Sequence, residues 1–413
     1  MAYVPPHKRH SDDSGRPAPT PELLAPRFKR NLNLKASQSS TDKSGKIIYA
    51  DHAVSRWFPV GLTDDNQIPS SVQLEPVSVE FIEQKIGGKP LALVNGHLDE
   101  ENNDPRVDIL RSPWASIAEN VLQDLLSSFE ALKNQTDCQK LDEVKPTLVA
   151  RFGRILFRGG PSTNLSNIQK APISETTVKK LKRLFYTNIP SSYMENVLSG
   201  VFRNIGDSCE EKDIYHVKLS DKIQPEATIS CKCSIKEDNK LTLYKVELNQ
   251  VRYFVTDISC LGKNLDMRLM LCSKRILTAL TDDEMNSIKQ LIDSAILDPN
   301  VKGGLRWPLG KASTGDRFSV CGVWHTIAKS YSSPTMRLKV RQADRFDFRT
   351  GSGEYTREIT LKLKGLVSKM QEEKVEESTI SDMLKDNLRL IWDKFLCWEP
   401  VLTEGLANIP NSA

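Results

Sequence analysis

The feature that most constrains this sequence is a strict alternation of apolar and charged residues that begins at Met336. Apolar side chains occupy positions 336, 338, 340, 346 and 348, and most of the odd positions between 337 and 349 are basic. Because successive side chains of a strand point to opposite faces, this period of two predicts a strand with one apolar and one cationic face. A turn-like Thr350-Gly351-Ser352-Gly353 follows, and the alternation then resumes with reversed parity as far as Leu363, which predicts a β-hairpin.

The register of this hairpin determines which charges meet. If Arg349 faces Glu354, the pairs farther from the turn are Arg345 with Glu358, Arg341 with Lys362 and Lys339 with Lys364. Like charges directly opposite each other destabilise a sheet, so an anion bound there would relieve repulsion. The candidate anion or RNA contacts on the hairpin are therefore Arg337, Lys339, Arg341, Lys362 and Lys364. The alternative is a cationic face that only keeps the sheet soluble, and the pattern leaves open whether the face points outward or into a cavity.

Positive charge is concentrated at the N-terminus. The formal net charge is +4, but residues 1–46 hold nine Lys or Arg against four acids, which makes that segment +5 and the remainder −1. The segment is rich in Pro and Ser and shows no sustained period, so we expect residues 1–45 to form a disordered basic tail. Its candidate contacts to RNA or another anion are Lys8, Arg9, Arg27, Lys29 and Arg30.

The rest of the chain has the pattern of an α+β protein. Strand-like runs between residues 213 and 277 are separated by short turns, which predicts an antiparallel meander. Helices are expected from Ser112-Pro113, from a capping box of Ser192 and Glu195, from another of Thr281 and Glu284, and before Pro400. Two further assignments are a strand over residues 77–82 and a helical face over residues 178–185. The prediction is a large, mostly antiparallel sheet with about five helices.

We expect residues 46–405 to form a single globular region, with a seam between two lobes near 134–145 as an alternative, and residues 406–413 to be disordered. Eight scattered cysteines without paired metal-ligand spacing indicate reduced thiols, and Cys231 and Cys233 would share one face of a strand as core residues. No apolar run has membrane-spanning length, and no secretory signal is evident, so we expect no membrane association and a nuclear or cytoplasmic location.

Motif searches yield no catalytic site. Gly310-Lys311 lacks the earlier glycine and the hydroxyl residue of a phosphate-binding loop, because Leu305 and Ala312 stand at those positions. The six histidines lie too far apart for a metal site, and we expect no catalytic residue, no metal and no cofactor. Trp307, beside the loop-like segment, is expected to form a packing corner.

The first residues resemble a short peptide of known proteins. Tyr3-Val4-Pro5-Pro6-His7-Lys8-Arg9 is similar to the Tyr-x-Pro-Pro-His-x-Arg peptide in the N-terminal tails of Ded1-type DEAD-box RNA helicases, except that Lys8 stands where those tails typically have Leu. The resemblance implies an RNA-associated partner protein. A second apolar island follows at residues 21–28, and the candidate partner-binding residues are Tyr3, Pro5, Pro6, Leu23, Leu24 and Phe28.

Two broader resemblances concern the body of the chain. The segments MAYVPPHKRH, PTPELLAPRFKRNLNL and GKIIYADHAVSRWFPVGL together resemble an uncharacterised family of land-plant proteins with a domain of unknown function. An antiparallel sheet with basic strands is also similar to the triphosphate tunnel enzymes, which implies basic residues inside a barrel and a Glu-x-Glu strand for metal. The chain has no Glu-x-Glu, and Glu80 and Glu83 would point to opposite faces of the predicted strand.

These patterns give one leading hypothesis and two alternatives. The leading hypothesis is a noncatalytic RNA-associated or ribonucleoprotein adaptor that uses the basic tail and the cationic hairpin face, with RNA or an RNA-associated protein as its partner. The first alternative is a phosphohydrolase-like enzyme that acts on a phosphorylated substrate, with basic strands lining a cavity. The second is a plain protein-interaction module.

Overall fold

The computed structural model describes residues 48–60, 72–95, 112–137, 143–158, 173, 178, 181–201, 208–225, 228–236, 240–314 and 317–396. The helices are α2 (Glu80–Ile86), α3 (Pro113–Asp137), α6 (Ser191–Asn196), α7 (Asp282–Asp293), α8 (Lys364–Gln371) and α9 (Glu377–Lys394). The longer strands are β1 (Ile48–Val60), β4 (Glu143–Arg158), β6 (Ser208–Asp221), β7 (Thr228–Ile235), β8 (Leu241–Leu248), β9 (Val251–Cys260), β10 (Asp266–Ile276), β14 (Phe318–Ser332), β15 (Met336–Asp347) and β16 (Ser352–Leu363). Short strands are β2 (Val72–Pro76), β3 (Leu91–Asn95), β5 (Lys182–Tyr186), β11 (Ile296–Leu297), β12 (Leu305–Arg306) and β13 (Ser313–Thr314).

Eight strands close into a barrel, and the cationic hairpin forms part of its wall. The strands β10, β8, β7, β6, β14, β15, β16 and β4 are successive neighbours in one sheet. β10 also pairs with β4, from Asp266 opposite Gly153 to Ile276 opposite Glu143, so the last strand meets the first. A barrel of eight strands has an interior that side chains fill or that holds one small ligand. The predicted α+β class with a mostly antiparallel sheet is confirmed, and β1 beside β9 is a parallel pair.

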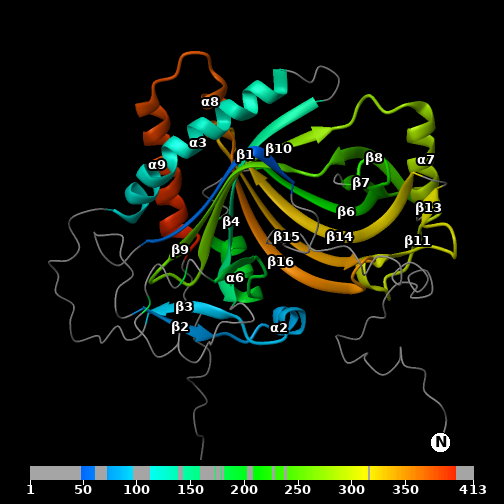
Figure 1. Ribbon diagram of the computed structural model, residues 1–413, viewed down its shortest axis with the longest axis horizontal. Helices are drawn as coiled ribbons and strands as arrows, with labels where there is room; N and C mark the ends of the chain where they lie inside the picture. Colours follow the sequence, from blue (N-terminus) through cyan, green and yellow to red (C-terminus); the bar gives the residue numbers. More distant parts are fainter. Residues whose placement is uncertain are drawn as a thin grey trace, which may run out of the picture.

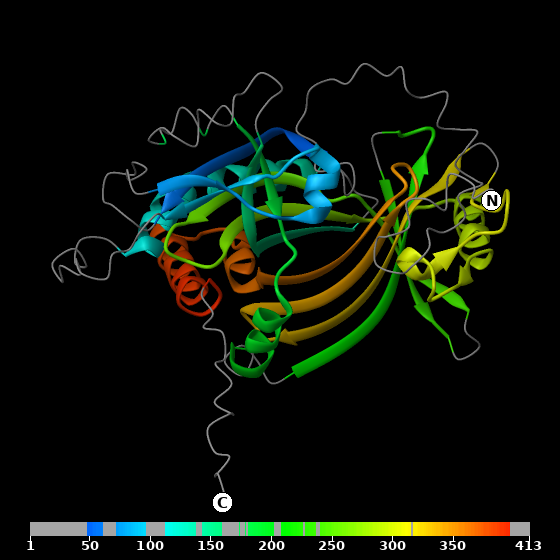
Figure 2. The same cartoon turned by 90° about the horizontal axis from the view of Figure 1, so that it is seen from below.

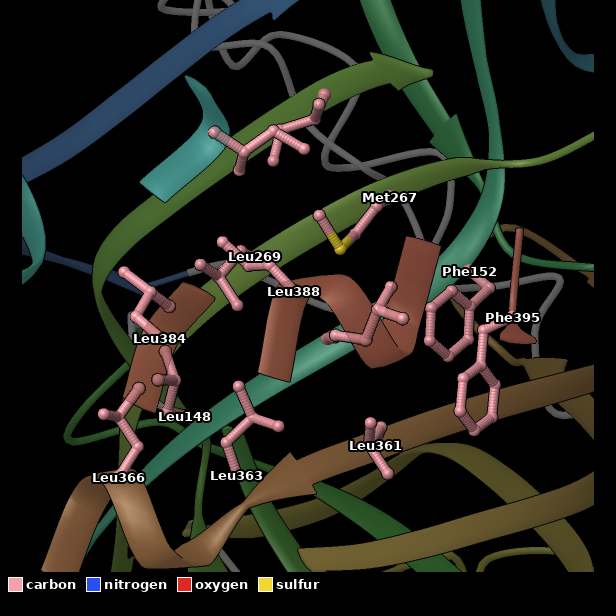
Figure 3. Close-up of a cluster of buried hydrophobic side chains, with 14 of the residues drawn as sticks. Leu148, Phe152, Met267, Leu269, Leu361, Leu363, Leu366, Leu384, Leu388 and Phe395 are labelled. Atoms are coloured by element: carbon pink, nitrogen blue, oxygen red, sulfur yellow. The ribbon is translucent and has the colours of Figure 1, made fainter. Parts of the chain in front are cut away.

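The largest hydrophobic core lies outside this barrel, between its wall and three helices. Figure 1 shows α3, α8 and α9 together at one end of the molecule. Their apolar faces pack on residues of β4, β10 and β16 that point away from the barrel interior, as Figure 3 shows for Phe152, Leu269 and Leu361. The apolar stripe predicted for the first long helix is confirmed, since all five of its residues are buried: Ile117, Val121, Leu125, Phe129 and Leu132. None of the helices in the described part of the chain combines the length and hydropathy that crossing a membrane requires.

A second core covers the opposite end of the barrel, where α7 lies (Figures 1 and 2). α7 begins with the predicted capping box: the Glu284 backbone N–H donates to Thr281 Oγ1 at 3.3 Å, and the Thr281 N–H donates to Glu284 Oε2 at 2.8 Å. Trp307 forms the expected packing corner, because its indole N–H donates to the Leu291 carbonyl oxygen and its ring is buried. The thiols of Cys231 and Cys233 lie in this core on one face of β7, as predicted.

Three local predictions were wrong. Residues 80–86 form helix α2 rather than a continuation of the strand predicted over 77–82. Phe185 lies in strand β5 and pairs with Ile155, so its spacing from Val178 did not mark a helical face. α6 begins after Pro190 without a side-chain capping bond. In each case the segment packs on β4 or its neighbours, and tertiary packing overrides a short local pattern.

The hairpin has the predicted strands and faces but a different register. β16 begins at Ser352, opposite Asp347, so the loop is residues 348–351 and the pairing slides by four positions. Asp347 fixes this loop: its side chain accepts from the Arg349 backbone N–H at 2.8 Å, and its carbonyl oxygen accepts from Gly351, whose φ is 63°. Because four is even, every side chain keeps its predicted face. The observed pairs are Arg345 with Glu354, Arg341 with Glu358, Lys339 with Thr360 and Arg337 with Lys362.

Gly153 is expected to be essential where β4 meets β5. A Cβ atom at this position would lie 2.1 Å from the Tyr186 carbonyl oxygen, so Gly153→Ala must push β5 away from β4. We expect a loss of about 1–3 kcal/mol in the free energy of unfolding, measured by urea denaturation. Gly88→Ala is the control, because no atom lies within 4 Å of its added methyl group. Equal stability of the two variants would contradict this packing.

Candidate site in the barrel interior

The inner face of the barrel is strongly cationic. Eight basic residues on this face, here called the interior cation cluster, come from six strands: Arg151, Lys218, Lys232, Lys274, Lys339, Arg341, Arg345 and Lys362. The alternation explains why these side chains point inward. Leu338 and Val340, which flank Lys339, are buried in the hydrophobic core outside the barrel, so Lys339 points to the inside. All of the cluster except Lys362 line a cavity of about 320 Å³. This volume is near the lower end of the roughly 300–1,000 Å³ that is typical of small-molecule sites.

Much of this positive charge makes no ion pair in the part of the chain that the structure describes. Within those residues, Arg151, Lys218, Lys274, Lys339 and Lys362 make no ion pair. The Nε atom of Arg151 is buried and lacks a hydrogen-bond partner. Buried cations are normally paired, because an unpaired charge in a protein interior loses its hydration without compensation. The interior is therefore electrostatically incomplete without an anion.

The lysines of the cluster have lowered pKa values as a result. Burial, followed by repulsion from Arg341 and neighbouring lysines, lowers the pKa of Lys339 to about 7. Burial is also the main reason that the pKa values of Lys218 and Lys232 fall to about 8. Burial lowers the pKa values of Lys274 and Lys362 in the same direction. An anion in the cavity would restore the charged forms, so its binding would be coupled to proton uptake.

Two interior carboxylates are fully engaged with cations. Glu358 is 2% exposed and accepts from Arg341 Nε at 2.7 Å, Arg345 Nη2 at 2.5 Å and Thr187 Oγ1 at 3.1 Å. Burial opposes its ionisation, but Arg341, Arg345 and Arg151 hold its pKa far below the ordinary value.

Glu247 is the second of these carboxylates. It accepts from Lys232 Nζ and Lys245 Nζ, each at 2.9 Å. Burial alone would raise the pKa of Glu247, but Lys274 and Lys232, with the hydrogen bonds from Lys245 and Lys232, lower it to about 2. Both acids therefore serve to position basic side chains.

Aromatic side chains contribute to the cavity wall. Trp324 on β14 lines it, with Lys218 Nζ 4.4 Å from the centre of one indole ring and Arg345 Cζ 5.0 Å away. His216 lies beside Trp324, and burial lowers its pKa well below the ordinary value. On another side, α2 and β5 close over the cavity with Phe81, Ile82 and Tyr186. The cavity thus has a basic interior and a partly aromatic border.

The predicted site residues fall into three groups. Lys339 and Arg341 line the cavity, and Lys362 lies on the same inner face. Arg337 pairs with Glu210 at 2.9 Å, and Lys364 begins α8 and donates to Ser332 Oγ at 3.0 Å. The third group lies outside the described residues and consists of Lys8, Arg9, Arg27, Lys29, Arg30, Tyr3, Pro5, Pro6, Leu23, Leu24 and Phe28. The like-charge pairs expected for Arg341 and Lys339 do not occur, because the register differs.

The sequence patterns did not single out Arg151, Lys218, Lys232 and Lys274. Their signal was nevertheless present. Lys218 follows Val217 and precedes Leu219, and Lys232 stands between two core cysteines. A single lysine between two buried residues of a strand must point to the face opposite the core, and the repetition of this pattern in successive strands indicates a basic interior.

Among the described residues, the cavity wall offers no ready-made group of ligands for a divalent metal ion. No three His, Cys, Asp or Glu side chains among the described residues lie close enough to hold one together. Glu80 and Glu83, once expected on opposite faces of a strand, lie in helix α2, where Glu83 Oε1 accepts from Ser78 Oγ and from the Val79 N–H, both at 2.9 Å. Mg²⁺ sites need carboxylate oxygens that are available for coordination, and those of Glu358 and Glu247 already bind cationic side chains.

These features define a barrel protein with a basic internal cavity. The chain belongs to the family defined by the domain of unknown function DUF7903, whose sequence model matches residues 41–395. This confirms the resemblance to an uncharacterised family, while the plant origin and the helicase-like tail stay predictions. A search of curated protein sequences finds no match.

Several solved structures are similar in outline. The S. pombe Pct1 RNA triphosphatase has 12% sequence identity and a TM-score of 0.40, and the match covers 71% of this chain and 97% of that one. A Mimivirus capping enzyme triphosphatase has 10% identity and a TM-score of 0.32, with 66% and 97% covered. A putative adenylate cyclase from Bacillus halodurans has 9% identity and a TM-score of 0.23, with 52% and 90% covered. With TM-scores below 0.5, these likenesses carry no weight for the function.

The lowered lysine pKa values predict an unusual pH dependence. Between pH 6.5 and 8 the folded protein releases protons from Lys339, Lys218 and Lys232, whereas the unfolded chain keeps these lysines protonated up to about pH 10. The unfolded state then binds more protons, so stability rises with pH, by about 1–2 kcal/mol over this interval without ligand. Urea denaturation at several pH values measures this rise, and Lys339→Met should flatten it. A constant or falling stability would contradict the lowered pKa values.

Proposed function

We propose that this protein binds the phosphate chain of a phosphorylated ligand inside the barrel. The observation that carries the proposal is the group of five interior cations without an ion pair among the described residues: Arg151, Lys218, Lys274, Lys339 and Lys362. They come from five different strands, so a ligand that satisfies them must present several anionic groups in a row. Lysine ammonium and arginine guanidinium groups are the usual partners of phosphate oxygens.

This function shares the basic cavity and the phosphorylated ligand of the first alternative from the sequence, the phosphohydrolase-like enzyme, and differs from the RNA adaptor. The cationic face of the hairpin points into the cavity and is not an outer surface on which a folded RNA can lie. An RNA ligand is compatible with this geometry through a phosphorylated end that enters the barrel. The basic N-terminal tail, which lies outside the described residues, then remains a predicted contact to the rest of such an RNA.

Hydrolysis of a phosphoanhydride is a second candidate function, favoured by one observation. Lys339 has a pKa of about 7 and lies beside Arg341 in the cavity wall. A group that titrates near neutral pH is suited to donate a proton to a leaving phosphate, and a neighbouring guanidinium stabilises the charge that develops on it. Release of orthophosphate from tripolyphosphate, ATP and 5′-triphosphorylated RNA, measured with and without Mn²⁺ or Mg²⁺, tests this candidate separately from binding.

Calorimetric titration of the purified full chain tests the binding function. We expect tripolyphosphate to bind and orthophosphate to bind at least about a hundredfold more weakly. A single phosphate reaches only part of the interior cation cluster, whereas phosphates joined in one molecule bind with a higher overall affinity. The titration is repeated at raised salt, because charges inside the barrel are screened less than charges on a surface patch. Equal affinity for the two anions, or no heat of binding with tripolyphosphate, would overturn the proposal.

A further inference from the structure

Most of the acidic side chains in the cavity wall are already bound to basic groups. Four acids contribute to its wall: Glu247, Glu358, Asp347 and Glu354. Glu247 and Glu358 each bind two basic side chains, and Asp347 accepts from Arg349 Nη2 at 3.1 Å. Sites that use Mg²⁺ for phosphoryl chemistry hold the ion with one or two carboxylates together with the phosphates. Three of the four acids of this cavity bind arginine or lysine instead.

The basic side chains of the cavity repel one another, and they would repel a divalent cation as well. Arg151 and Lys339, which have no ion pair in the described chain, both experience repulsion from Arg341, and Lys339 also experiences repulsion from Lys274. A divalent cation brought into this group would be repelled by every member. The ion would neutralise negative charge on the phosphate oxygens that the basic side chains already neutralise.

From this arrangement we infer that the cavity binds its polyphosphate ligand in the metal-free form. The interior cation cluster supplies the neutralising charge that a divalent metal supplies in other phosphate sites, and Glu247 and Glu358 hold Lys232, Arg341 and Arg345 in position. The inference rests on the proposed phosphate-binding function. It specifies which form of the ligand binds: the cavity prefers the fully ionised polyphosphate over its Mg²⁺ complex.

This preference predicts that Mg²⁺ weakens the binding of tripolyphosphate. Chelation by Mg²⁺ removes two negative charges from tripolyphosphate and occupies oxygens that the lysines would contact. Either Mg²⁺ must dissociate from the polyphosphate before the polyphosphate binds, or the Mg²⁺–polyphosphate complex binds with fewer contacts to the protein. Mg²⁺ should therefore act as a competitor for the ligand, whereas a metal-dependent site requires it.

The test is a pair of calorimetric titrations of the full chain with tripolyphosphate, one in EDTA and one with Mg²⁺ in excess over the ligand, at matched ionic strength. We expect binding in EDTA and an apparent affinity at least about tenfold weaker in Mg²⁺. Binding that needs Mg²⁺, or that tightens with it, would overturn the inference. Absence of binding in both buffers would instead remove the proposed function, so the two failures are distinguishable.

Glu247→Gln provides a second test that separates the two kinds of site. The substitution keeps the shape of the side chain but removes a negative charge close to Lys232 and Lys274. For a metal-free site we expect the folded variant to bind tripolyphosphate in EDTA and to show the same weakening by Mg²⁺ as the wild type, because the carboxylate positions Lys232 and holds no metal. A site that uses this carboxylate for metal would lose its response to Mg²⁺. Thermal melting establishes that the variant is folded, and a folded Glu247→Gln whose affinity no longer responds to Mg²⁺ would count against the inference.

Discussion

Replacing Glu358 with alanine is expected to lower the free energy of unfolding by about 3–5 kcal/mol, because it leaves a buried charge cluster without its main counter-charge. The carboxylate is 2% exposed and bridges Arg341 and Arg345. Both guanidinium groups remain inside the barrel after the substitution, close to the unpaired Arg151. Urea denaturation of the purified variant at neutral pH measures the loss.

Glu210→Ala is the matched control for this prediction. Glu210 also pairs with an arginine of β15, Arg337, but its side chain is 52% exposed, and a solvated pair contributes little. We therefore expect a much smaller loss of stability from this variant. Tripolyphosphate should raise the melting temperature of Glu358→Ala more than that of the wild type, because the ligand replaces the missing negative charge. Equal destabilisation by the two substitutions would show that Glu358 does not neutralise a buried cluster.

The second large effect concerns the unpaired lysines, where we expect affinity and stability to change in opposite directions. Lys339→Met and Lys274→Met each remove a buried ammonium group but keep much of the side-chain volume. Each should weaken tripolyphosphate binding about tenfold or more, since a charge-assisted hydrogen bond contributes roughly 1.5–3 kcal/mol. Each should also leave the ligand-free protein as stable as the wild type or more stable, because an unpaired buried charge is removed. Calorimetry and urea denaturation measure the two quantities.

Lys329→Met is the control for the lysine variants. Lys329 lies on β14 and pairs with Glu211 outside the barrel, with a side chain that is 47% exposed. Its loss should leave the affinity for tripolyphosphate within about a factor of two and the stability nearly unchanged. If Lys339→Met and Lys274→Met lowered stability without weakening binding, these lysines would have a structural role instead.

The sequence predicted the faces of the hairpin correctly because the alternation is local. Arg341 and Lys339 were placed on one side of β15 and Leu338 on the other, as the structure has them. The register could not be derived in the same way. Two glycines, Gly351 and Gly353, offered alternative loops, and the choice depends on the bonds to Asp347 that only the folded loop reveals.

The direction of the cationic face required information that no single strand contains. Whether Lys339 points to solvent or into a cavity depends on the pairing of β10 with β4, which closes the barrel, and these strands lie more than a hundred residues apart in the chain. The same closure brings Lys218, Lys232 and Lys274 opposite the hairpin. Each looked like an ordinary lysine in its own strand, and the repeated pattern acquires its meaning only when the strands form a ring.

The most direct test of a phosphate-binding interior is a crystal structure of the full chain with tripolyphosphate, grown without divalent metal. We expect density for the phosphate chain inside the barrel, with oxygens within hydrogen-bonding distance of Lys339, Lys274 and Arg151. Phosphate density confined to the outer surface, with these three side chains unchanged, would contradict this expectation.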